Sequence, residues 1–86
     1  MKIHKLKLDI AYCDAVYSGE KPFEIRTNDR GYQKGDFVVF TPVDGIYTVD
    51  HPVQDNKYEI TYVLSYFGLK DGYVAFGIRE VEAPDD

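Results

Sequence analysis

The chain has 86 residues, of which 44 % are hydrophobic and 15 % aromatic, so it holds enough apolar surface for one small folded domain and is not expected to be disordered. Its net charge of −5 argues against non-specific binding to nucleic acid over the whole surface. The charge is uneven: residues 1–34 hold seven Lys/Arg and five Asp/Glu (+2), whereas residues 35–86 hold three and ten (−7).

The sequence lacks the usual signs of membrane insertion, secretion and metal binding. No apolar run approaches the roughly 20 residues of a membrane helix, and "MKIHKLKLDI" alternates instead of forming the apolar block of a signal peptide. The single cysteine, Cys13, cannot form an internal disulfide, so we expect a cytoplasmic protein. His4 and His51 are far from Cys13 and from each other, so we expect neither a metal nor a cofactor.

The chain begins with a predicted strand and a predicted helix. Residues 2–8, "KIHKLKL", alternate, and the face with Leu6 and Leu8 is expected to be buried, with His4 as a satisfied core residue. Asp9 is a helix cap and Gly19 is suited to end the helix in a left-handed conformation. Four apolar residues recur between them at helical spacing: Ile10, Cys13, Val16 and Tyr17.

A second strand is predicted directly after the helix. Residues 21–27 return to a period of two, with Phe23 and Ile25 on one face and Glu24 and Arg26 on the other. The segment "TNDRGYQKGD" that follows is rich in turn residues, and Asp36 at its end is expected to fix the turn into the next strand.

Three more strands are predicted in the second half. The apolar run "FVVFTPV" reads as a strand buried on both faces that ends at an edge or bend at Pro42. Residues 44–57 look like a long loop or irregular hairpin. The next strand, "YEITYVLSY", places five residues on one face: Tyr58, Ile60, Tyr62, Leu64 and Tyr66. The last strand, "YVAFGIREV", contains Gly77, which suggests a bulge or bend.

These elements predict an α+β fold in one domain, residues 1–82, with a frayed acidic tail at residues 83–86. Short turns after the helix favour antiparallel pairing. A thin core with glycine-assisted bends favours a small, curled sheet or open barrel of about five mostly antiparallel strands, with one or two helices and a helix at its mouth.

The stretch "GEKPFEIR", followed by "NDRGYQKGD", has the form Gly-x-Lys-x-x-Glu-x-Arg across a helix-to-strand junction. It resembles the ASCH domain of the PUA-like superfamily, and more closely a compact, poorly characterised branch in bacteria and phages. The resemblance covers nearly the whole chain. It implies a PUA-like β-barrel with a helix beside a cleft, and a role in binding RNA or a modified nucleotide.

Some ASCH proteins resemble amidohydrolases that deacylate cytidine derivatives with a Lys and a Thr of this motif. By that resemblance Lys21 matches the Lys, whereas Glu24 stands where those proteins have Thr. The amine is therefore kept and the hydroxyl nucleophile is lost. If this chain is an enzyme, Lys21 and Glu24 are the expected catalytic pair.

Six residues are the predicted ligand-binding set: Lys21, Glu24, Arg26, Arg30, Tyr32 and Lys34. Glu24 and Arg26 are about 6.6 Å apart along a strand and point to one face. That face is either a solvated surface with weak ion pairs or a cleft in which Arg meets a phosphate or base edge and Glu accepts from an exocyclic amine.

The other members of the set lie on the loop after the motif. Arg30 and Lys34 would extend the site toward a phosphate backbone, although loop charges are more often only solubilising. Tyr32 is the preferred aromatic for stacking on a base, because the core has less claim on it than on Tyr58, Tyr62 and Tyr66.

The sequence leaves three functions open. The leading one is recognition of RNA or a modified nucleotide through Lys21, Glu24 and Arg26. The second is hydrolysis of an acylated cytidine, with Lys21 and Glu24 activating water. The third is a protein-interaction module whose acidic C-terminal half meets a basic partner.

Overall fold

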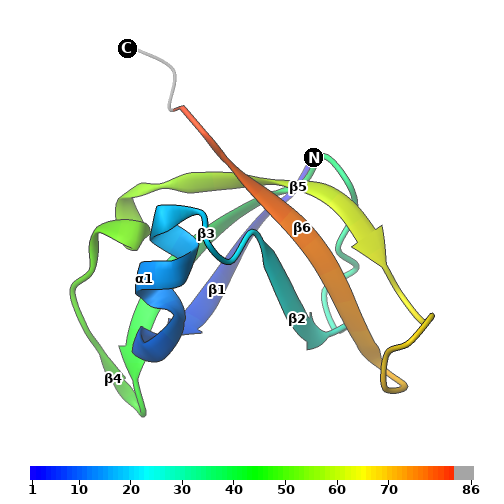
Figure 1. Ribbon diagram of the computed structural model, residues 1–86, viewed down its shortest axis with the longest axis horizontal. Helices are drawn as coiled ribbons and strands as arrows, with labels where there is room; N and C mark the ends of the chain where they lie inside the picture. The colour runs from blue at the N-terminus through cyan, green and yellow to red at the C-terminus, as the bar shows by residue number, and fades with distance from the viewer. Residues whose placement is uncertain (83–86) are drawn as a thin grey trace.

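The computed structural model describes residues 1–82. Six strands form one curled mixed sheet, accompanied by one α-helix and a short 3₁₀ helix (Figure 1). The elements are β1 (Ile3–Asp9), α1 (Ile10–Ser18), β2 (Phe23–Thr27), β3 (Phe37–Asp44), β4 (Tyr47–Thr48), the 3₁₀ helix η1 (Pro52–Asp55), β5 (Lys57–Leu64) and β6 (Tyr73–Val81). The predicted strand–helix order is confirmed. The irregular segment 44–57 adds the short strand β4 and the turn η1, and the expected tail at 83–86 lies outside the described residues.

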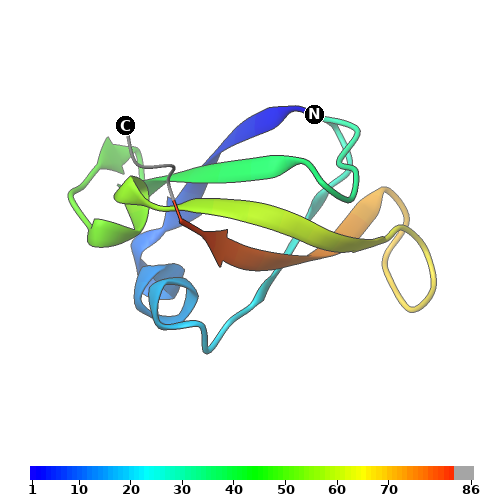
Figure 2. The ribbon, with the colours of Figure 1, turned by 90° about the horizontal axis from the view of Figure 1, so that it is seen from above.

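The strand order is β1-β3-β5-β6-β2, with β4 beside β3. β1 and β3 are parallel, whereas the other four pairs are antiparallel. β5 and β6 run side by side along the molecule (Figure 2). α1 and β4 lie at one end of the sheet and the β5–β6 loop at the other (Figure 1). No helix in residues 1–82 is long and apolar enough to cross a membrane.

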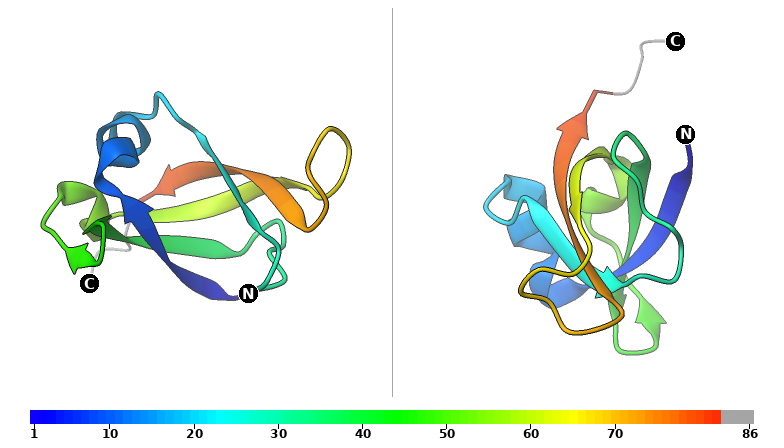
Figure 3. Two further views of the ribbon diagram at one scale, coloured as in Figure 1. Left: turned by 90° about the horizontal axis from the view of Figure 1, so that it is seen from below. Right: turned by 90° about the vertical axis from the view of Figure 1, so that its right-hand side faces the viewer.

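The expected barrel is not confirmed. β1 and β2 are the two ends of the strand order, and no ladder joins them within residues 1–82. Both strands nevertheless lie on the same side of the curled sheet (Figure 3, left). The chain passes from β1 through α1 to β2, and the two edge strands pair with different neighbours, β1 with β3 and β2 with β6.

The helix follows its predicted signals. The Asp9 carboxylate accepts a hydrogen bond from the Ala11 N–H at 2.9 Å, which satisfies one of the free donors at the helix start. Gly19 ends the helix with φ 84°, a left-handed conformation that costs glycine no steric strain. Cys13 and Val16 are the residues of α1 that are buried, so a narrow stripe packs the helix against the sheet.

The core lies between α1, η1 and the inner face of the sheet. β1 alternates as predicted, with His4, Leu6 and Leu8 buried. Thirteen apolar residues form the core cluster: Leu6, Leu8, Cys13, Val16, Tyr32, Val38, Phe40, Val53, Tyr58, Ile60, Val74, Phe76 and Ile78.

His4 and Asp36 form a buried polar pair beside this core. The His4 Nε2 atom lies 2.8 Å from Asp36 Oδ2, and the backbone N–H groups of Lys2 and Gln33 also donate to the Asp36 carboxylate. Burial by itself would raise the pKa of Asp36, but these hydrogen bonds outweigh it and lower the pKa. The expected roles of His4 as a satisfied core residue and of Asp36 as a turn residue are confirmed.

β3 differs from its prediction. Val38, Phe40 and Pro42 are buried, but Thr41 is exposed and Val39 is only half-buried, so one face alone is in the core. One short helix at the end of the sheet covers too little surface to bury a second face. Pro42 lies within the strand, opposite Leu8 of β1, and not at its end.

β5 also differs from its prediction, because a β-bulge lies between Ile60 and Tyr62. Tyr58 and Ile60 are buried as expected, but the extra residue turns Tyr62 and Leu64 to the opposite face. The bulge faces Gly77 of β6, where a Cβ atom would come within 2.5 Å of the Thr61 Oγ1 atom. The irregularity predicted near Gly77 is therefore present, in the neighbouring strand.

Candidate functional site

Side chains, and not backbone ladders, bridge the gap between β1 and β2, which we call the seam. The Arg26 guanidinium donates from Nη2 to the Lys7 carbonyl at 2.6 Å. The Arg30 guanidinium donates from Nη1 to the Lys5 carbonyl at 3.1 Å. Both carbonyls belong to the unpaired edge of β1, so the two arginines satisfy acceptors that a further strand would otherwise satisfy.

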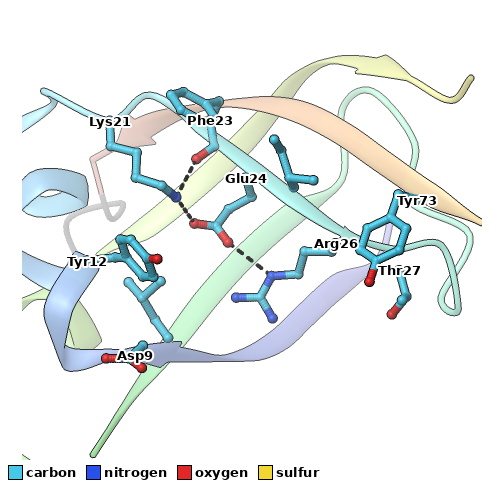
Figure 4. Close-up of a pocket in the computed structure, with 10 residues that line it drawn as sticks. Asp9, Tyr12, Lys21, Phe23, Glu24, Arg26, Thr27 and Tyr73 are labelled. Atoms are coloured by element: carbon cyan, nitrogen blue, oxygen red, sulfur yellow. Dashed lines mark hydrogen bonds and ion pairs between the residues drawn. The ribbon is translucent and has the colours of Figure 1, made fainter. Parts of the chain in front are cut away.

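A cleft of about 540 Å³ opens at the seam. This volume lies within the roughly 300–1,000 Å³ typical of small-molecule sites. Ten residues line the cleft: Leu8, Asp9, Tyr12, Lys21, Phe23, Glu24, Ile25, Arg26, Thr27 and Tyr73. They come from the end of β1, the first turn of α1, β2 and its approach, and the start of β6 (Figure 4).

Glu24 is the centre of the site. Its side chain is 5 % exposed, and its two oxygens accept from different cations. Lys21 Nζ lies 2.6 Å from Oε1, and Arg26 Nε lies 3.0 Å from Oε2 (Figure 4). A carboxylate removed from water in this way needs both partners to offset its lost hydration. The three residues therefore form a partly buried triad, and the alternative of a solvated strand face is wrong.

The triad retains unused hydrogen-bonding capacity. Lys21 also donates to the Phe23 carbonyl at 3.0 Å, which leaves one of its three N–H groups without an acceptor in residues 1–82. Arg26 uses two of its five N–H groups, on Glu24 and Lys7. Since the Lys21 and Arg26 side chains are 20 % and 21 % exposed, their remaining donors are accessible from the cleft.

Two aromatic rings flank the ammonium group of Lys21. Nζ lies 5.3 Å from the centroid of the Tyr12 ring and 5.0 Å from that of Phe23. Both distances are within the range of cation–π attraction. The rings are themselves 52 % and 44 % exposed, so aromatic surface is available at the rim of the cleft (Figure 4).

The predicted loop residues do not join this site. Arg30 supports the seam from outside the lining of the cleft, and Lys34 is exposed, with no side-chain hydrogen bond or ion pair within residues 1–82. Tyr32 was expected to be free for stacking, and that expectation is wrong. It is 6 % exposed, with its ring 4.8 Å from those of both His4 and Phe76. Burial in this aromatic cluster raises the pKa of its hydroxyl.

Sequence reasoning missed five lining residues with aromatic or polar side chains: Asp9, Tyr12, Phe23, Thr27 and Tyr73. Asp9 was assigned only to the helix cap. Tyr12 carried a usable signal, because it lies off the apolar stripe of the helix and is a large aromatic with no core position to fill. Tyr73 gave no such signal, since its place in the cleft depends on the pairing of β6 with β2.

The described part of the chain has no cluster of side chains suited to metal binding and no accessible thiol. Residues 1–82 contain no group of three or more His, Cys, Asp or Glu side chains placed to hold a metal ion. Cys13 is fully buried, and this burial raises the pKa of its thiol. The thiol is therefore a packing group in the core.

Residues 3–78 match the family described as "Domain of unknown function (DUF3850)". The chain belongs to this family. The matched range contains both edge strands and every residue that lines the cleft. The triad and the seam therefore lie within the part of this chain that matches the family.

Two further proteins are similar to this chain. The chain is 42 % identical over 48 residues to the "Uncharacterized 12.9 kDa protein in GpA 3'region" of Escherichia phage P2, a match that spans 55 % of this chain and 44 % of the phage protein. The crystal structure of hypothetical protein PH0355 superposes with a TM-score of 0.62 and 19 % identity, covering 94 % of this chain and all of that one. At that identity the likeness shows the fold alone.

Proposed function

We propose that this DUF3850 domain is an ASCH-like member of the PUA-like superfamily that binds a nucleotide, free or within single-stranded RNA, in the cleft. The observation that carries the proposal is the Lys21–Glu24–Arg26 triad, which is partly buried at the centre of a cleft of about 540 Å³. The resemblance of "GEKPFEIRTNDR" to the ASCH motif supports the same reading, because Lys21, Glu24 and Arg26 are its charged positions.

The donors and acceptors of the cleft suit a polar ring with a hydrogen-bonding edge. Arg26 offers N–H groups in a fixed fork, which suits a base edge or a phosphate. Each Glu24 oxygen retains a lone pair that accepts from an exocyclic amine. The exposed rings of Tyr12 and Phe23 provide faces for stacking, which contributes about 1–3 kcal/mol per base.

The charge of the cleft favours a single nucleotide over a long backbone. Lys21 and Arg26 contribute two positive charges, and Glu24 and Asp9 contribute two negative ones, so the formal sum is zero. Tight binding along many phosphates requires an excess of cations. The cleft instead matches one base or modified base with at most one phosphate contact.

Amide hydrolysis of an acylated cytidine is the second candidate, because Lys21 Nζ and Glu24 Oε1 are in contact at 2.6 Å within the cleft. An ammonium group has no lone pair with which to act as a base, however, and Lys21 Nζ is held here in an ion pair with the Glu24 carboxylate. Hydrolysis would therefore depend on Glu24 activating water. We expect slow or no turnover when the nucleoside is incubated with the protein and the products are separated by chromatography; multiple turnovers that vanish in Lys21→Ala would establish the enzyme instead.

Arg26→Ala tests the binding proposal, with Arg30→Ala as a matched control. Each variant removes one hydrogen bond to a β1 carbonyl across the seam, but only Arg26 lines the cleft. Arg26→Ala should weaken binding to a preferred nucleotide or short single-stranded RNA by about 1–3 kcal/mol, and lower the salt slope by about one if a phosphate is contacted. Arg30→Ala should keep most of the affinity.

The measurement is a titration of each protein at two salt concentrations, combined with thermal melts. Arg26→Ala also loses its bond to Glu24, so its melting temperature should fall by a few degrees more than that of Arg30→Ala. Equal affinities for wild type and Arg26→Ala, with a much lower melting temperature for the variant, would show that the triad is structural and would remove the proposal.

A further inference from the structure

The outer face of β2, β6 and β5 carries an apolar surface that extends beyond the cleft. Its β2 residues, Phe23 and Ile25, also border the cleft, whereas its β5 residues do not. The pairing register places Phe23 and Tyr62 on either side of Gly77, and Ile25 and Leu64 on either side of Ala75. Residues opposite one another on neighbouring strands point to the same face. We call the four large side chains the outer patch: Phe23, Ile25, Tyr62 and Leu64.

The shape of the outer patch is a shallow trough. Its sides are the large residues of β2 and β5, and its floor is Ala75 and Gly77 of β6 between them. The β-bulge at Thr61 creates one of these sides, because it turns Tyr62 and Leu64 away from the core. A Cβ atom at Gly77 would lie 2.5 Å from Thr61 Oγ1, so the Thr61 side chain covers Gly77 and the trough is open over Ala75.

The outer patch brings four large, partly exposed side chains together on one face of the sheet. Phe23, Ile25, Tyr62 and Leu64 are 44 %, 54 %, 65 % and 37 % exposed. For side chains of this size these fractions amount to about 400 Å² of apolar surface in total. That is within the range of roughly 300–600 Å² in which the largest apolar patch of a soluble protein is often an interaction site.

The charges around the patch favour a protein surface over nucleic acid. The cations at its border include Lys21, whose Nζ lies over the Phe23 ring, and Arg79, which follows Gly77 by two residues on β6. Arg79 is paired with Glu59 across β5 and β6, and Lys21 is paired with Glu24. The patch itself carries no charge, whereas stacking platforms for nucleic acid lie in positively charged grooves.

We propose that the outer patch is the interface through which two copies of this chain form a symmetric dimer. An uncharged surface is compatible with itself, despite the net charge of −5 on each copy. In a two-fold arrangement, the large β2 side chains of each copy pack against the trough of the other copy. The Glu59–Arg79 pair at the rim presents both signs, so a second copy can meet it with opposite charges.

The area agrees with a weak to moderate dimer. Protein interfaces are roughly 56–65 % apolar, so about 400 Å² of apolar surface corresponds to about 650 Å² of interface on each copy. The total of about 1,300 Å² lies at the lower end of stable interfaces, which begin near 1,200 Å². The dimer should therefore dissociate on dilution.

Sedimentation velocity from micromolar to near-millimolar protein tests the interface. The wild-type mass should rise from one chain toward two. Ile25→Glu places a carboxylate in each half of the interface and should weaken association by about 100-fold or more. Ile46→Glu is the matched control: Ile46 is 91 % exposed at the β3–β4 turn, outside the outer patch, so this variant should dimerise like the wild type.

Leu64→Glu provides an independent check from β5, and far-UV circular dichroism with a cooperative melt confirms that each variant is folded. Arg26→Ala should dimerise normally, which separates this proposal from that of nucleotide binding. A wild type that stays monomeric at every concentration, or an Ile25→Glu variant that is folded and dimerises like the wild type, overturns the interface. Ile25 also lines the cleft, so the assignment to nucleic acid is tested with Leu64→Glu, which lies outside that lining. Loss of RNA binding in a monomeric Leu64→Glu would assign the outer patch to nucleic acid and also overturn the interface.

Discussion

The two edge strands of the sheet, β1 and β2, have opposite polarity although they face one another across the seam. β1 directs Leu6 and Leu8 inward and exposes Lys5 and Lys7. β2 directs Glu24 and Arg26 inward and leaves its apolar residues, Phe23 and Ile25, 44 % and 54 % exposed. One strand follows the usual rule of apolar residues inside, and the other reverses it.

The reversal in β2 costs stability on both faces. Its inner charges lose hydration, and its outer apolar residues lose the gain that burial would provide. Local rules are most often broken at functional sites. We infer that β1 holds the fold together, whereas β2 serves two adjoining surfaces: the cleft around Glu24 and Arg26, and the outer patch, whose β2 residues also border the cleft.

The largest expected effect on stability comes from a substitution on the buried face of β1. Leu6 is 2 % exposed within the core, so Leu6→Ala removes buried methyl groups and leaves a cavity. We expect a loss of about 2–5 kcal/mol in the free energy of unfolding, measured by denaturant titration. Ile3→Ala, on the exposed face of the same strand, should change it by less than about 0.5 kcal/mol.

Nucleotide affinity provides a second test of the contrast between β1 and β2. Leu6 does not line the cleft, so Leu6→Ala should bind normally at temperatures where it is folded. If Leu6→Ala were as stable as Ile3→Ala, β1 would not be the stabilising edge and the contrast with β2 would fail.

The next largest effect is on the inner face of β2. Glu24→Ala leaves Lys21 and Arg26 close together without their carboxylate, and should cost about 2 kcal/mol of stability because both cations are still partly solvated. Removing all three charges, with Lys21→Met, Glu24→Leu and Arg26→Met together, should restore most of that stability, because apolar replacements of buried ion pairs are often neutral. Binding of the nucleotide should be lost in both variants.

This experiment distinguishes a ligand-binding role of the three charges from a structural role. Denaturant titration gives the stability and fluorescence titration gives the affinity. A triple variant that is much less stable than Glu24→Ala would show that the charges of β2 hold the fold, and that the strand does not reverse its polarity for the sake of a ligand.

Much of the fold was predictable because the local signals agree with one another. The change of period at Gly19, from helical spacing to alternation, correctly marks the end of α1 before β2. The Asp9 cap and the buried face of β1 follow equally from the sequence. Whether the sheet closes into a barrel could not be predicted from the sequence, because closure depends on how closely β1 approaches β2. These two strands are separated by α1 and pair with different neighbours.

The site was predictable in its charged centre and not in its surroundings. The motif correctly placed Lys21, Glu24 and Arg26 in one cluster. Which face of β2 points inward is a tertiary question, because alternation alone fits either choice. Tyr32 was misassigned for the same reason: a turn-rich loop can still fold back over the core, and its ring fills the space between His4 and Phe76.

The smallest expected effect concerns the anchoring of the β1 edge at acid pH. The Asp36 carboxylate accepts from His4 and from the N–H groups of Lys2 and Gln33, and its pKa is lowered in the folded state. A group with a lowered folded-state pKa contributes stability above its unfolded pKa, near 3.9, and that contribution is lost as the pH falls through the folded value. Asp36→Asn should therefore cost about 1 kcal/mol at neutral pH and lose less stability than the wild type on acidification.

Denaturant titrations between neutral pH and pH 3 measure this difference, with the exposed Asp55→Asn as a control that should keep the wild-type slope. The seam should not be affected at neutral pH, because Arg26 and Arg30 bond to Lys7 and Lys5, beyond the residues that Asp36 holds. If Asp36→Asn lost stability in acid as steeply as the wild type, the acid sensitivity would originate elsewhere. The triad at Glu24 would be the next group to test, and the anchoring role of the β1 edge would then be limited to its apolar face.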